Sequence, residues 1–126
     1  MVQFEVKGQL RGGKDHIQTR RDGRRYPLKA FVVWRGDVLL QIKQAFREQA
    51  RPIPHFTVPL SIEVSYFPSD NRKRNITAML DGLFHVFEVI GLVEHDELFE
   101  NCDWKNCGID RENPRAMIII RTMGRG

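Results

Sequence analysis

The residues of this sequence whose types and spacing could do chemistry lie along one amphipathic helix and the acidic turn after it. Thr77, Asp81 and His85 recur at intervals of four, which places them on a single polar stripe of that helix. The turn Glu94-His95-Asp96-Glu97 follows closely. Carboxylates hold Mg²⁺, and paired Mg²⁺ ions about 3.5–4 Å apart can activate water and stabilise the leaving oxygen when a phosphodiester is hydrolysed. A polar stripe is also the ordinary solvated face of a helix, so both interpretations stay open for Asp81 and His85.

Two basic segments accompany these residues, and both suit contact with a phosphate backbone. The loop 11–29 carries many more Lys and Arg residues than Asp residues, and a shorter run, Arg72-Lys73-Arg74, stands directly before the helix. Duplex DNA presents one phosphate charge about every 1.7 Å of its axis, so such segments can bind DNA without reading its sequence. The alternative is that the loop is only a solvated, mobile part of the surface.

Hydrophobic periodicity predicts the elements that must position these residues. Alternating apolar residues indicate strands at 2–7, 58–67, 98–105 and 116–121, and apolar residues at intervals of three and four indicate helices at 28–50 and 75–90. The segment 8–27 has no periodicity and is predicted to be a long, flexible, basic loop. We therefore expect a single α+β domain over residues 1–126, in β-α-β-α-β-β order, with a small mixed sheet packed by two helices.

The composition fits a small globular domain. The 126 residues are 41% hydrophobic and 29% charged, with a net charge of +4. No apolar run approaches the roughly 20 residues of a membrane span. The two cysteines, Cys102 and Cys107, make a poor zinc site because no second pair is nearby, and both are predicted to be reduced. These features predict a cytoplasmic protein with no membrane partner.

The order and spacing of these features resemble the RusA family of Holliday junction resolvases, which are crossover junction endodeoxyribonucleases. In that family an Arg-rich stretch leads into Asp-x-Asp-Asn at a helix start, and an Asp-Asp pair follows the helix. The similarity covers almost the whole chain and includes the Gly-rich basic loop and Lys105. It implies a homodimer that binds branched DNA, specifically four-way junctions. It also implies that the dimer cuts them with Mg²⁺, for which Mn²⁺ can substitute.

The resemblance also assigns site residues, and here the sequence departs from the family. Asn75 and Thr77 stand at the two Asp positions of Asp-x-Asp-Asn, Asp96 matches one member of the Asp-Asp pair, and Asp81 stands where members carry a Lys. We therefore expect a metal-binding and catalytic centre of Asn75, Asp81 and Asp96. Asn75 brings no negative charge to offset the dehydration of Mg²⁺, so the chain is expected to cleave slowly or not at all until Asn75 is changed to Asp.

The resemblance and the basic segments together predict the DNA-binding residues, which are Lys14, Arg20, Arg21, Arg24, Arg25, Arg72, Lys73, Arg74 and Lys105. The first hypothesis is a structure-selective, Mg²⁺-dependent endonuclease that resolves four-way junctions and is silenced here by Asn75. The second is a catalytically inactive branched-DNA-binding protein on the same scaffold. A weaker third is a basic RNA- or protein-binding α+β domain. For the homodimer, the strand at 98–105 and the first helix are the expected contacts.

Overall fold

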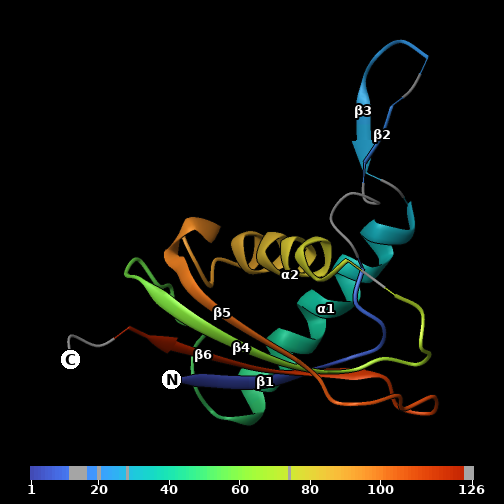
Figure 1. Ribbon diagram of the computed structural model, residues 1–126. Coiled ribbons are helices and arrows are strands. Elements are labelled where there is room, and N and C mark those ends of the chain that lie inside the picture. The colour runs from blue at the N-terminus through green and yellow to red at the C-terminus, as the bar shows by residue number, and fades with distance from the viewer. Residues whose placement is uncertain (12–16, 20, 28, 74, 124–126) are drawn as a thin grey trace.

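The computed structural model describes residues 1–11, 17–19, 21–27, 29–73 and 75–123, and it confirms the expected α+β fold (Figure 1). Its main sheet has four strands in the order β1-β6-β4-β5, where β4 and β5 are parallel and the other neighbouring pairs are antiparallel. The elements of this body are β1 (Val2–Lys7), α1 (Lys29–Glu48), β4 (Leu60–Phe67), α2 (Ile76–Ile90), η2 (Asp96–Leu98), β5 (Phe99–Asn106) and β6 (Arg115–Thr122).

One face of the sheet and both helices enclose the hydrophobic core. Alternate strand residues share rows across the sheet, as Phe4 pairs with Ile118 and Ile118 with Val64. These side chains are buried against the apolar sides of the two helices, for example Val38 of α1 and Leu83 of α2. The other face of the sheet is only partly buried, so the body has two layers. None of the described helices is long and apolar enough to cross a membrane.

Local signals fix both ends of α2. Asn75 has an extended backbone, with φ −75° and ψ 112°, and its side-chain oxygen accepts a hydrogen bond from the backbone N–H of Ala78, which is the usual geometry of a helix N-cap. At the other end Gly91 adopts φ 80°, a left-handed conformation that favours glycine. The backbone N–H groups of Gly91 and Leu92 bond back to Glu88 and Phe87 at 3.1 and 2.9 Å.

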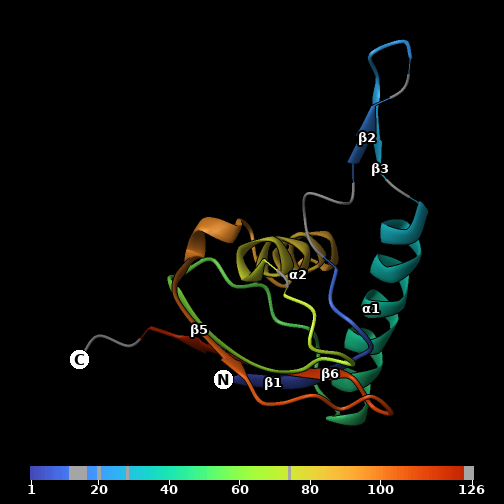
Figure 2. The ribbon, with the colours of Figure 1, turned by 45° about the vertical axis from the view of Figure 1, so that its right-hand side comes forward.

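The segment 8–27 corrects one expectation, because it is not wholly a loop. β2 (Ile17–Thr19) and β3 (Arg25–Pro27) pair antiparallel as a second, two-stranded sheet. This hairpin stands clear of the body in both views (Figures 1 and 2). Its turn contains Gly23 at φ 84°, and the backbone N–H of Arg24 donates to Asp22 at 2.9 Å. Strands of three residues are too short to show a period, so the sequence carries no signal for them.

Candidate nucleic-acid interface

The candidate site lies where β4 and β5 end and α2 begins. β4, α2 and β5 form a β-α-β unit with parallel strands, so the carboxyl ends of both strands lie beside the N-terminus of the helix. A cavity of about 290 Å³ opens there, lined by Tyr66, Pro68, Asn71, Arg72, Lys73, Ile76, Met79, Trp104 and Asn106. Ligands of open α/β sheets bind outside the carboxyl ends of strands, and helix N-termini attract anions.

A small hydrogen-bond network brings the two basic segments to this end of the molecule. The Tyr66 hydroxyl donates to Oε1 of Gln9 at 2.8 Å, and the backbone N–H of Ser69 donates to the same oxygen at 3.1 Å. The backbone N–H of Leu10 in turn donates to the Tyr66 hydroxyl at 3.2 Å. The chain leaving β1 is therefore fixed beside the chain leaving β4. Arg11, which begins the first basic segment, and the connection that carries Arg72 and Lys73 therefore leave the sheet at the same end.

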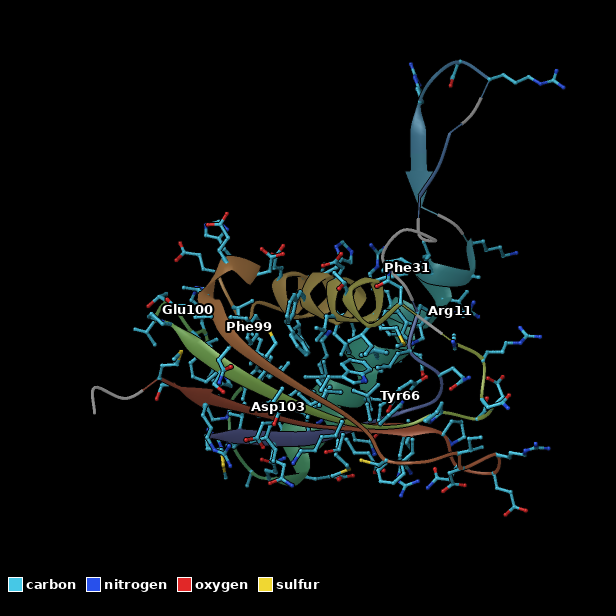
Figure 3. The ribbon with its side chains drawn as sticks, in the orientation of Figure 1. Arg11, Phe31, Tyr66, Phe99, Glu100 and Asp103 are labelled. Carbon is cyan, nitrogen blue, oxygen red and sulfur yellow. The ribbon has the colours of Figure 1, made fainter. Side chains whose placement is uncertain are left out.

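Gly82 allows the same segment to pass directly over α2. A Cβ atom at Gly82 would clash with the backbone carbonyl oxygen of Arg11, and it would also meet the ring of Trp34. Only glycine leaves room for this close approach. Arg11 consequently lies against α2, at the end of the molecule opposite Glu100 (Figure 3).

The cationic side chains at this end are exposed to solvent. Arg11, Arg72 and Lys73 are exposed, and so are Arg21 and Arg24 at the tip of the hairpin. Arg24 lies 3.8 Å from Asp22, an exposed pair that contributes little energy. The first turn of α2 has no acidic residue, so nothing in that turn offsets the positive end of the helix dipole. The cations and the dipole therefore favour the same ligand, an anion such as a phosphate.

The structure does not bring the three expected metal ligands together. Asn75 uses its side-chain oxygen to cap α2, bonding Ala78 at 3.3 Å. Asp96 lies at the other end of α2, where its backbone N–H donates to Oε1 of Glu88 at 2.9 Å. The 15 residues of α2 extend about 22 Å, so Asn75 and Asp96 lie far too far apart to share a metal ion. The single centre expected from Asn75, Asp81 and Asp96 is corrected accordingly.

Asp81 remains exposed on the flank of α2, between these two positions. It is six residues from Asn75 and seven from Glu88, which corresponds to about 9 and 10 Å along the helix axis. His85, the next residue of the polar stripe, is not on a solvated face. Its Nε2 lies 3.2 Å from Nη1 of Arg35, and its ring lies 5.6 Å from the ring of Phe31. Asp81 of the polar stripe therefore faces solvent, whereas His85 lies at the interface of α1 and α2.

Lys105 does not face the cavity. It is in register with Ser65 on the partly exposed face of the sheet, whereas Trp104 is in register with Val64 on the helix-covered face. Trp104 packs edge-on against Tyr66, with ring centroids 5.7 Å apart. Of the other expected DNA-binding residues, Lys14, Arg20 and Arg74 lie outside the described residues, and Arg25 belongs to β3.

Sequence reasoning missed the residues that assemble the site. Gln9 and Tyr66 hold the two basic segments together, and Asn71, Trp104 and Asn106 help to line the cavity. One signal was present, because a tyrosine at a core-facing strand position needs a partner for its hydroxyl. The partner itself, Gln9, lies far away in the sequence and could not be identified from spacing.

The opposite end of α2 is acidic. Glu88, Glu94, Asp96, Glu97 and Glu100 are all exposed there, and the chain has no Lys or Arg between residues 75 and 104. The last turn of α2 likewise contains no basic residue. The molecule thus has a basic end and an acidic end, joined by one helix.

Comparisons with known protein families and with curated proteins find no match to this chain. The likeness to the RusA family therefore rests on the order and spacing of the motifs.

Proposed function

We propose that this protein binds branched DNA, with four-way junctions as its substrate, on a RusA-like scaffold. The observation that carries the proposal is the single basic end. Gln9 holds the chain that leaves β1 beside Ser69, in the connection that carries Arg72 and Lys73 to the N-terminus of α2. Phosphates are attracted there by side-chain cations and by the helix dipole together.

The shape of this end favours branched over linear DNA. The hairpin stands away from the body (Figure 2), and Arg21 and Arg24 lie in the turn between its strands. Arg72 and Lys73 lie instead in the connection between β4 and α2. Two separated sets of cations suit strands that diverge from one point, as the arms of a junction do. The cavity beside Trp104 and Tyr66 adds aromatic and amide groups next to the phosphate contacts, which suits an unpaired base at the crossover.

We propose binding without hydrolysis for the chain as it stands. Junction resolution with Mg²⁺ or Mn²⁺ needs converging carboxylates, and Asn75, Asp81 and Asp96 are spread along α2. This spacing supports the second of the three hypotheses, the inactive junction-binding protein. The endonuclease hypothesis is tested in the same assay, since nicked product would contradict this part of the proposal while leaving the binding part intact.

We further propose that two copies form a homodimer through α1. Val33 and Leu40 are 65% and 67% exposed on either side of Gly36, so α1 presents an apolar stripe to solvent. A Cβ at Gly36 would meet no described residue of the chain within 4 Å, yet a glycine in mid-helix costs about 1 kcal/mol relative to alanine. Close approach of a second helix at Gly36 accounts for both features. The expected contribution of β5 is less well supported, because its residues after Phe99 are mostly polar and exposed.

The binding test uses a fluorescein-labelled four-way junction and a linear duplex of the same length and composition. Fluorescence anisotropy is recorded in EDTA and again in Mg²⁺, and strand integrity is followed on denaturing gels. We expect the junction to bind at least tenfold more tightly than the duplex and to remain uncut. Equal affinity for the two DNAs, or no binding at low salt, would overturn the proposal.

The dimer test uses sedimentation of the chain with and without the junction. Val33→Glu and Leu40→Glu place charges on the exposed stripe and are expected to give monomer, whereas the control Arg111→Glu, on the exposed turn between β5 and β6, is expected to leave the dimer intact. A native protein that stays monomeric at micromolar concentration with junction bound would remove this part of the proposal.

A further inference from the structure

A groove runs between the open edge of the sheet and α1, away from the basic end. β1 is the edge strand, and its only strand neighbour among the described residues is β6. The groove has a volume of about 750 Å³ and is lined by Phe4, Glu5, Lys7, Gly8, Asp37, Gln41, Gln44, Ala45, Glu48 and Gln49. Its floor contains apolar groups of Phe4 and Ala45, and its outer wall is the polar side of α1.

Side chains from α1 and the residue after it already hydrogen-bond the backbone of this edge. The backbone N–H of Lys7 donates to Oε1 of Gln41 at 2.7 Å, and Nε2 of Gln41 donates to the carbonyl of Lys7 at 3.1 Å. Gln49 donates through Nε2 to the carbonyl of Gln3 at 2.9 Å. The side-chain amide of Gln41 thus makes the same pair of bonds that one residue of an added antiparallel strand would make.

The backbone of Glu5 lies between these two contacts. In an antiparallel pair, alternate residues direct both their N–H and their C=O toward the same neighbour. Because Gln3 and Lys7 direct their backbone groups toward α1, Glu5 does so as well. Among the described residues, none makes a hydrogen bond to the N–H or C=O of Glu5 on this side. An edge strand with open backbone groups in a groove beside a helix is suited to strand addition.

We propose that this groove binds an extended basic peptide segment of a partner protein, which adds to β1 as a further strand. The charge of the lining favours a basic partner, because two carboxylates of α1, Asp37 and Glu48, accompany one ammonium group, that of Lys7. The third carboxylate, Glu5, is already paired with Arg115 at 3.5 Å. Pairing with β1 of a second copy is disfavoured, since it would bring two acidic walls together. The added strand displaces Gln41 and bonds the backbone of Glu5 and Lys7, with its cationic side chains beside Asp37 and Glu48.

The probe is a capped five-residue peptide of alternating lysine and valine, titrated into the ¹⁵N-labelled protein. Two matched peptides serve as controls: one has glutamate in place of lysine, and one has the lysine sequence with methylated backbone nitrogens. We expect the amide resonances of Glu5 and Lys7 to shift with the first peptide, and both controls to bind at least tenfold more weakly. Equal binding of the acidic peptide, or shifts confined to the acidic end at residues 88–100, would overturn the proposal.

Variants separate the backbone and charge contributions. Glu5→Pro removes the outward N–H, which an edge strand tolerates, and is expected to reduce peptide affinity at least tenfold relative to Glu5→Ala, which keeps it. Asp37→Asn combined with Glu48→Gln leaves β1 unchanged and is expected to weaken the lysine peptide about tenfold. Gln41→Ala is expected to tighten peptide binding, because the competing amide is gone. If Gln41→Ala instead makes the protein self-associate and binds peptide no better, the glutamines only protect the edge and the proposal fails.

Discussion

The two ends of α2 have opposite charges, and each charge opposes the helix dipole. The N-terminal end, which is the positive end of the dipole, is bordered by Arg72 and Lys73. The C-terminal end, which is the negative end, contains Glu88 and is followed by Glu94. Charges near a helix end are worth about 0.3–1 kcal/mol each, so both sets weaken the helix rather than stabilise it.

The helix tolerates these charges because other features hold it in place. Asn75 caps its start, Gly91 ends it, and Leu83, Val86 and Phe87 are fully buried against the sheet. The charged residues around it are thus not needed for folding. The two ends differ in charge, so one attracts a polyanion and the other repels it. Under the proposed function, this difference orients the protein on DNA.

The largest expected effect comes from reversing the charge of the basic end. Arg72→Glu with Lys73→Glu should lower junction affinity on the order of 100-fold at about 0.1 M salt, because two phosphate contacts become repulsive. The matched control is Glu94→Lys with Glu97→Lys, which makes an equal and opposite change at the acidic end. That control should bind as tightly as the native chain or more tightly. If both double substitutions lower junction affinity by the same factor, the difference in charge between the two ends of α2 does not contribute to DNA binding.

Removing the charges at the hairpin tip should have a smaller effect. Arg21→Ala with Arg24→Ala is expected to lower junction affinity about tenfold and to reduce the slope of log affinity against log salt by about 2, roughly 0.9 for each phosphate contact. The control is Arg51→Ala with Arg111→Ala, which removes the same charge from exposed positions outside both the hairpin and α1. An unchanged slope would show that the hairpin is only solvated surface and that the body carries all of the binding.

Adding a carboxylate to the basic end tests whether this substitution restores Mg²⁺-dependent cleavage. Asn75→Asp keeps a good N-cap and places a negative charge beside the phosphates, so we expect junction affinity to fall about threefold. We expect no Mg²⁺-dependent nicking, because Asp96 lies at the far end of α2. Nicking that disappears on adding Asp96→Asn would show that Asp96 reaches the site after all, from the same copy or from its partner.

The sequence predicted the part of the site that depends on neighbouring residues. The predicted helix 75–90 agrees closely with the observed Ile76–Ile90, because Asn75 and Gly91 act within one turn of the helix. The path of the chain from Gln9 to Arg11 was not predictable, since it depends on Gln9 meeting Tyr66 and on Gly82 admitting the backbone of Arg11. The expected metal centre was misplaced because similarity of spacing says nothing about where the chain goes after the helix ends.

The smallest expected effect concerns the acidic end alone. Glu88→Gln keeps the side-chain oxygen that accepts from the N–H of Asp96 but removes a negative charge from the last turn of α2. We expect the free energy of unfolding to rise by about 0.3–0.5 kcal/mol in urea titration at low salt, and the gain to shrink as salt increases. Junction affinity should change by less than about twofold, because one of several carboxylates at this end is lost. If Glu88→Gln lowers the free energy of unfolding, the charged hydrogen bond from Glu88 to Asp96 stabilises the protein more than the negative charge of Glu88 destabilises the end of α2.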